Sequence, residues 1–332
     1  MKRRTLSRAL LVPGVLVAAA ACGEQHVNPF EKKILQVPRR VGSEELDAHL
    51  LRLHGKTPGE RAAALWALSD LGTADDQIRS VLPDALRDPS DEVRFAALHA
   101  LARRGLAPGA SGGEVGGLVV DLLDADAVGL RAAARDAIPA LGPTVVEALA
   151  SRLRAESRRT RWNAAAALER LGPDADQALT QLTRSLTSEQ DEAVRERIAG
   201  ALSHLGTGGP FVLLTELANS RAGQGGSALE ALRRVPADRL APAARQALGE
   251  IDKPEVRDAV AQLAAENREL ALLLVPELVR LLDDEGPAAL DAEDALASAG
   301  EAARSALHAK AAAGPSPGAD AARGLLERLD GR

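Results

Sequence analysis

An arginine followed eleven positions later by a glycine recurs five times in this chain and constrains its fold more than any other feature. Successive arginines are 33, 37, 30 and 34 residues apart, whereas the interval from arginine to glycine never changes. The five pairs are Arg61–Gly72, Arg94–Gly105, Arg131–Gly142, Arg161–Gly172 and Arg195–Gly206. A constant inner interval with a variable outer one indicates a repeated structural unit joined by loops of different length.

Each segment from arginine to glycine has the pattern of an amphipathic helix. Apolar residues recur at offsets +3, +7 and mostly +10 from the arginine, which places them on one side of a helix. The glycine stands where a helix end commonly needs a left-handed residue. A turn such as 88–94 contains the arginine, and a shorter apolar helix such as 80–87 precedes that turn. The sequence therefore predicts a helix–turn–helix unit, and the scarcity of aromatic residues (three Phe, two Trp and no Tyr) argues against a sheet-based core.

The turn sequence Asp-Pro-Ser-Asp-Glu-Val-Arg at 88–94 and the terminal Leu-Gly resemble the HEAT repeat family. The variety is the bacterial HEAT-like type first noted in phycobilisome lyases. The resemblance implies an all-α fold, a right-handed α-solenoid of about nine HEAT-like helix-turn-helix repeats over residues 43–331. The expected units span 43–72, 76–105, 112–142, 143–172, 173–206, 208–235, 237–267, 268–300 and 301–331. Repeat 208–235 is expected to be the weakest, because Gly225 and Gly226 lie near its arginine position and Val235 replaces its glycine.

In the HEAT family the repeated arginines form a ladder that joins one repeat to the next. The resemblance therefore implies a structural role for Arg61, Arg94, Arg131, Arg161 and Arg195. A cation in the first turn of a helix opposes the helix dipole, so we expect acidic residues of the preceding turn to offset it. These acids are Asp88 and Asp91 before Arg94, Asp124 and Asp126 before Arg131, and Asp191 and Glu192 before Arg195. A functional anion site at these arginines is the alternative.

Residues 1–21 have the pattern of a secretory signal peptide. A basic start precedes an Ala-rich apolar run, 9–21, that is too short to span a membrane. The alanines before Cys22, the only cysteine, resemble the lipobox of bacterial lipoproteins, with Ala19 in place of the usual leucine. The resemblance implies that Cys22 is lipidated and that residues 22–42 tether the solenoid to a membrane. Gly23 implies the periplasmic side of the outer membrane if the host has two membranes, and an ordinary signal peptide with an incidental Cys22 is the alternative.

Charge excludes one class of partner. The full chain has a net charge of −6, and residues 1–21 hold four basic residues and no acid. The remainder therefore has 37 basic and 47 acidic side chains and a net charge of −10. We expect no nucleic acid and no anionic lipid surface as a partner, because both need a basic footprint.

No motif in the sequence predicts catalysis. Residues 109–113 match the G-x-S-x-G of a nucleophile elbow but fall in an expected loop, without the strand that the motif requires. Residues 223–227 precede a helix but lack the lysine of a phosphate-binding loop. The six histidines are never four positions apart and do not cluster with cysteine. We expect no enzyme, no metal and no cofactor.

One group of side chains suggests binding. Offsets +1, +5 and +8 of the second helix point away from the core stripe, towards the concave face that a HEAT solenoid would have. Trp66, Phe95, His99 and Trp162 occupy +1 or +5 positions, and three of the five aromatic residues of the chain are among them. Exposed aromatic residues on such a face are typical anchors for a protein or peptide partner. The alternative is that these rings fill gaps between Ala-rich helices.

Together these features predict an envelope lipoprotein, held to the membrane through lipidated Cys22, that serves as a scaffold or adaptor for a protein or peptide of the cell envelope. Two alternatives stay open. One is a lyase-like protein that handles a cofactor or chromophore, which only the family name suggests. The other is a structural subunit of an envelope complex.

Overall fold

The computed structural model describes residues 43–331 apart from 72–74, 105–111 and 220–224. The expected signal peptide 1–21, Cys22 and the expected tether 22–42 lie outside the described residues. The described chain contains helices and no strand. None of these helices has the length and apolarity needed to cross a membrane.

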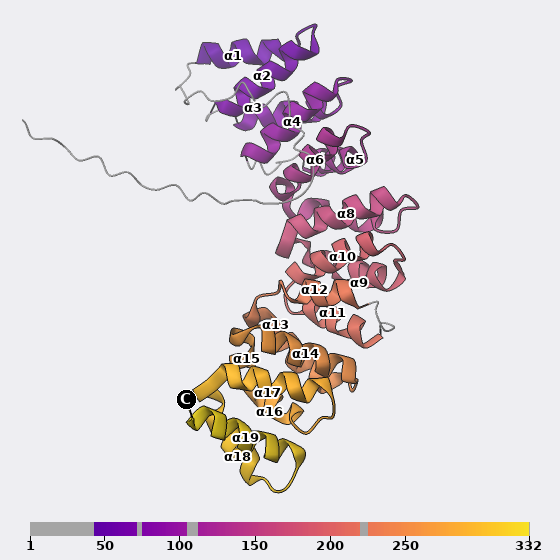
Figure 1. Ribbon diagram of the computed structural model, residues 1–332. Helices are drawn as coiled ribbons and strands as arrows, with labels where there is room; N and C mark the ends of the chain where they lie inside the picture. The colour runs from indigo at the N-terminus through magenta and orange to yellow at the C-terminus, as the bar shows by residue number, and fades with distance from the viewer. Residues whose placement is uncertain (1–42, 72–74, 105–111, 220–224, 332) are drawn as a thin grey trace, which may run out of the picture. The chain divides into compact units, whose positions relative to one another are not determined.

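The helices of the described residues follow one another along the chain as pairs (Figure 1). The first five pairs are α1 (Ser43–Arg52) and α2 (Pro58–Asp70), α3 (Asp75–Leu86) and α4 (Asp91–Arg104), α5 (Gly112–Leu122) and α6 (Val128–Leu141), α7 (Val146–Arg152) and α8 (Arg158–Leu171), and α9 (Leu179–Ser188) and α10 (Glu192–His204). The remaining pairs are α11 (Gly208–Asn219) and α12 (Gly226–Leu232), α13 (Ala237–Glu250) and α14 (Pro254–Glu266), α15 (Arg268–Leu273) continued by α16 (Val275–Leu281) with α17 (Pro287–Ala299), and α18 (Arg304–Ala312) and α19 (Pro317–Asp330). Short 3-10 turns precede three first helices: η2 (Gly142–Val145), η3 (Gly172–Ala178) and η4 (Gly300–Ala303).

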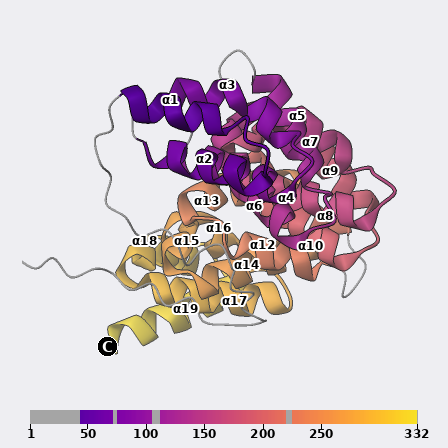
Figure 2. The same cartoon turned by 90° about the horizontal axis from the view of Figure 1, so that it is seen from above.

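Each pair packs against the next one in the chain. The second helices α2, α4, α6, α8 and α10 are successive neighbours, and the first helices from α3 to α13 pack in the same order (Figures 1 and 2). The core between the two layers consists almost wholly of alanine, leucine and valine, with Leu65, Leu98 and Leu168 fully buried. Small alanine side chains let neighbouring helices approach closely, and leucines fill the remaining space. The prediction of an all-α, HEAT-like solenoid is confirmed.

Polar side chains start several of the second helices. Thr57 accepts a hydrogen bond from the Glu60 amide, and the Glu60 carboxylate accepts one from the Thr57 amide, a reciprocal capping box that begins α2. Ser157 and Asp191 cap α8 and α10 in the same manner with one bond each. These caps fix where each second helix begins, and therefore the place of the arginine in its first turn.

The repeat glycines do not all behave as the sequence predicts. Gly142, Gly172 and Gly300 end their helices with φ near +60° but with strongly negative ψ, a region essentially restricted to glycine rather than the left-handed helical one. Gly206 does not have a positive φ, because α10 already ends at His204 and Leu205 is extended. The expectation of a left-handed residue is therefore wrong for Gly206, whereas Gly72 and Gly105 lie outside the described residues.

The sixth pair has a short second helix but a close junction to the fifth. Helix α12 is 7 residues long and ends before Val235, which is buried. A Cβ atom on Gly209 would lie 1.9 Å from the Leu202 carbonyl oxygen, so only glycine lets α11 approach the end of α10 this closely. Helix α11 also packs against both α13 and α14, so the sixth and seventh pairs are in contact through α11 although α12 is short.

Candidate partner-binding face of the second helices

Arginines of the ladder bind acidic side chains of the following repeat. Arg61 donates from Nε and Nη2 to the two carboxylate oxygens of Asp88, at 2.7 and 2.9 Å. Arg161 holds Glu189 in the same way, at 2.7 and 3.1 Å. The acceptor lies 27 or 28 residues after the arginine, immediately before the next second helix. We call each such bidentate pair a rung.

The same guanidinium groups also close their own turn. Arg61, Arg131 and Arg161 each donate to the carbonyl oxygen six residues earlier, at 3.0, 2.7 and 3.0 Å. The acid of each rung also lies six residues before a ladder arginine: Asp88 precedes Arg94, and Glu189 precedes Arg195. Asp88 therefore binds the arginine of the preceding repeat, which differs from the expectation that it offsets Arg94. Asp91 and Glu192 do pair with the arginine of their own turn, as expected.

Two rungs lack their acid. The position that Asp88 and Glu189 occupy is held by Ala125 and Ala155 in the third and fourth units. Arg94 pairs instead with Asp91 of its own turn, and Arg131 donates to the carbonyl oxygens of Ala125 and Asp126. Arg195 reaches Glu216 on α11, with 3.0 Å between Nη2 and Oε1, and lies 3.6 Å from Glu192.

The rungs perturb their carboxylates. The hydrogen bonds from Arg61 are the main reason that the pKa of Asp88 is lower than its ordinary value. Burial acts to raise the pKa of Glu189, but the bonds from Arg161 and from the amides of Asp191 and Gln190 outweigh it and lower the pKa. Both acids are thus held ionised in the folded protein.

Three of the four predicted binding residues form one aromatic cluster. The Trp66 ring of α2 lies 4.3 Å from the His99 ring and 6.2 Å from the Phe95 ring, both on α4, between ring centroids. All three side chains are half-buried, and both Trp66 and Phe95 pack against the core. The cluster therefore joins the first two units, and each of its three residues stays partly exposed. It combines features of the two interpretations, an exposed anchor and a gap filler.

Trp162 lies apart from that cluster, on α8, and has two arginine neighbours. The guanidinium carbon of Arg135 on α6 is 5.3 Å from the indole centroid, and that of Arg197 on α10 is 5.4 Å away. Both distances are within the range of cation–π contacts. Neither arginine was predicted as a site residue from the sequence. Arg135 could have been found by aligning the repeats, because it replaces an apolar residue. No such feature of the sequence marks Arg197.

Charged residues between the second helices are mostly paired. Asp70 binds Arg103 at 2.5 Å, Asp136 binds Arg170 at 2.8 Å, and Glu169 binds Arg197 at 3.1 Å. Each pair links one second helix to the next. Partly exposed pairs of this kind contribute little stability, so their main effect here is to set the pattern of charge on this face.

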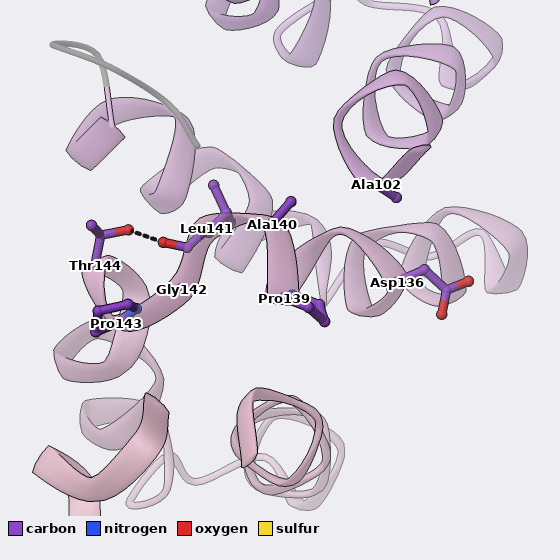
Figure 3. A pocket seen from close by; sticks show the side chains of 8 residues that line it. All are labelled: Ala102, Asp136, Pro139, Ala140, Leu141, Gly142, Pro143 and Thr144. Atoms are coloured by element: carbon purple, nitrogen blue, oxygen red, sulfur yellow. Dashed lines mark hydrogen bonds between the residues drawn. The ribbon is translucent and has the colours of Figure 1, made fainter. Parts of the chain in front are cut away.

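A shallow hollow of about 570 Å³ opens at the end of α6 (Figure 3). Its lining is largely apolar, with one carboxylate, and comprises Ala102, Asp136, Pro139, Ala140, Leu141, Gly142, Pro143 and Thr144. The Thr144 hydroxyl donates to the Leu141 carbonyl oxygen at 2.7 Å and keeps the turn at its edge closed. Within the described ranges no group of three or more His, Cys, Asp or Glu residues is placed to hold a metal ion.

A family model supports the repeat assignment over part of the chain. A family model described as HEAT repeats matches residues 115–203, from α5 to α10. No curated protein matches the chain. Among solved structures, an engineered protein, target OR497 of the Northeast Structural Genomics Consortium, is 18% identical with a TM-score of 0.38, and the alignment covers 86% of this chain and 88% of that protein.

Two karyopherin structures are also similar to this chain. Kap95p, from a structure that concerns its binding to RanGDP, is 14% identical with a TM-score of 0.45, over 82% of this chain and 41% of Kap95p. A Kap121p mutant is 14% identical with a TM-score of 0.46, over 86% of this chain and 37% of Kap121p. This chain thus spans less than half the length of either karyopherin.

Proposed function

We propose that this protein is a non-enzymatic, membrane-anchored lipoprotein of the bacterial envelope that binds a protein or peptide along the face of its second helices. The observation that carries the proposal is the half-buried aromatic cluster of Trp66, Phe95 and His99, which spans two repeats and whose residues are each partly exposed. Large, rigid aromatic side chains in such settings contribute much of the energy at protein interfaces. The HEAT-like solenoid supplies an extended surface for contacts of this kind.

The anchoring part of the proposal rests on the sequence of residues 1–23. Replacement of Cys22 by serine should abolish labelling by a fatty-acid analogue and move the protein out of the membrane fraction or leave it uncleaved. A variant that is cleaved normally and still partitions with the membrane would contradict the lipoprotein assignment.

The binding part can be tested by affinity purification of the full chain from detergent-solubilised envelope, followed by mass spectrometry. We expect Trp66→Ala to lose a partner that the unchanged protein retains, because truncation of an interface anchor costs roughly 2 kcal/mol or more of binding energy. Phe211→Ala is the matched control, since Phe211 is a half-buried ring on the first helix α11 that also packs against the core. Equal loss of the partner in both variants would indicate a general structural effect and contradict the proposal.

Thermal melts separate binding from folding. A fully buried ring truncated to alanine costs roughly 3–5 kcal/mol, and we expect less for Trp66 because part of its ring is already in solvent. If a variant with the native melting temperature still binds the partner as tightly as the unchanged protein, the cluster is not the binding site.

A further inference from the structure

Arg135 occupies a position that is apolar and buried in the neighbouring repeats. It lies four residues after the ladder arginine, where four other units have Leu65, Leu98, Ala165 and Ala199, each fully buried. An arginine there does not improve core packing and costs desolvation energy, because a charge is removed from water. Residues that break the local rule of their own fold are expected at functional sites.

Arg135 also lacks a partner that would compensate its charge. Among the described residues its side chain forms no ion pair and no hydrogen bond, and none of its nitrogens is closed off from solvent. Its guanidinium carbon lies 5.3 Å from the centroid of the Trp162 indole. By contrast, Arg170 and Arg197 nearby are neutralised by Asp136 and Glu169.

The charge around Arg135 is predominantly positive. Burial is the main cause that lowers the pKa of Arg135; the carboxylate of Asp136 acts to raise it, and Arg131, Arg170 and Arg197 lower it further. This excess of cations stands out in a chain whose net charge is −6. A carboxylate placed against Arg135 would give its guanidinium charge-assisted hydrogen bonds. A planar guanidinium can bind a carboxylate through two parallel hydrogen bonds.

The hollow at the end of α6 extends the site. Asp136 belongs to the lining of the hollow and is bound by Arg170, so the hollow borders the group of arginines. Its other walls are the small apolar surfaces of Ala102, Pro139 and Ala140 (Figure 3). A ligand with a carboxylate and a neighbouring apolar side chain would match both the guanidinium of Arg135 and the apolar hollow.

We propose that Arg135, flanked by Trp162 and the hollow at the end of α6, binds a glutamate or aspartate side chain in an acidic, partly apolar segment of the protein partner. This inference rests on the proposed function and specifies the chemistry of the partner. The guanidinium receives the carboxylate, the indole covers one side of the pair, and the hollow accepts the adjacent apolar side chain.

The test uses the full chain in detergent and a fluorescein-labelled peptide of alternating glutamate and leucine, with a second peptide in which glutamine replaces every glutamate. Fluorescence anisotropy should show binding of the glutamate peptide, weaker binding at higher salt, and at least about tenfold weaker binding of the glutamine peptide. Arg135→Leu should weaken binding of the glutamate peptide by at least about tenfold. Arg328→Leu is the matched control, because it removes an arginine of α19, which forms a pair with Glu293, and should leave binding unchanged.

The same variant distinguishes a site from a structural role. Leucine occupies this position in two other units, as Leu65 and Leu98, so Arg135→Leu should melt at the same temperature as the unchanged protein or higher. A lower melting temperature together with unchanged peptide binding would overturn the inference, and so would equal binding of the two peptides. Preferential binding of phosphatidylglycerol vesicles through Arg135, without binding of the glutamate peptide, would also overturn it. If Arg135→Leu retains the envelope partner that Trp66→Ala loses, and also retains the peptide, this inference fails while the proposed function stands.

Discussion

Arg61 on α2 holds the carboxylate of Asp88 with two hydrogen bonds, of 2.7 and 2.9 Å, across the boundary between the first two repeats. Arg161 and Glu189 repeat this arrangement between the fourth and fifth units. Arg257 lies 2.9 Å from Asp284, again 27 residues later, at the boundary between the seventh and eighth. The bidentate rung therefore recurs at two boundaries, and at the third a single contact between an arginine and an acid takes its place.

Removal of one rung should destabilise the protein measurably. In Glu189→Gln the half-buried Arg161 loses its charged partner, and we expect a loss of about 2–4 kcal/mol, slightly below the roughly 3–5 kcal/mol typical of fully buried pairs. The pKa of Glu189 is lower in the folded protein than its ordinary value of 4.5. Its carboxylate therefore stabilises the fold above pH 4.5, and this stabilisation is lost as the pH falls through the pKa of the folded state. Thermal melts at neutral and acidic pH measure both effects, with the exposed Glu196→Gln as control. Equal melting temperatures of the two variants at neutral pH would contradict the prediction.

Restoration of a missing rung should have the opposite effect. Among the described residues Arg131 has carbonyl oxygens but no carboxylate as partners, and the alanine at 155 holds the position of the acid. Ala155→Glu should raise the free energy of unfolding by up to about 1 kcal/mol, as expected for a partly exposed pair. Chemical denaturation measures the change, and Ala155→Gln provides a side chain of the same size without the charge. No difference between the glutamate and glutamine variants would show that the arginine does not reach this position.

The repeat glycines provide a third prediction. Gly172 has φ +60° and ψ −131°, so Gly172→Ala should cost roughly 1–3 kcal/mol through backbone strain alone, because a Cβ there would meet nothing within 4 Å. Gly117 within α5 has equal space but no positive φ, so Gly117→Ala should instead stabilise by about 0.5–1 kcal/mol. Denaturation of the two variants under the same conditions should shift in opposite directions. A shift in the same direction would mean that conformation at Gly172 is not the limiting factor.

The sequence predicts the helix pairs well because they depend on local periodicity and on a fixed interval within each unit. The predicted helix 61–72 corresponds to α2, Pro58–Asp70, and its apolar stripe becomes the buried core. The partners of the rungs depend on how one unit stacks on the next, which the interval within a unit does not determine. For this reason Asp88, assigned by sequence to Arg94 of its own turn, proves to bind Arg61 of the preceding repeat.

For the candidate site as well, the sequence predicts positions within a repeat but not contacts between repeats. Alignment of the repeats places Trp66, Phe95 and His99 on one face, and the structure brings their rings together. Alignment also reveals Arg135 as a charged residue at an apolar position, once offset +4 is compared across the units. Its contact with Trp162 on the next helix could not be deduced, because side-chain reach across two helices leaves no trace in the spacing.

The last prediction concerns acidic side chains of α14 and α17. Their effect on stability should depend on pH in the opposite sense to that of Glu189. Burial raises the pKa of Asp291, and the carboxylates of Asp294, Asp258 and Glu266 raise it further. A carboxyl with a raised folded pKa favours the folded state below its ordinary value of 3.8, and this contribution is lost as pH rises through the folded value. Asp291→Asn should therefore raise the melting temperature at pH 7, where it relieves repulsion, and the gain should vanish in acid. The exposed Glu285→Gln removes the same charge outside this group and should change little. Thermal melts at several pH values test the prediction, and a lower melting temperature of Asp291→Asn at neutral pH would show that its carboxylate has a stabilising partner instead.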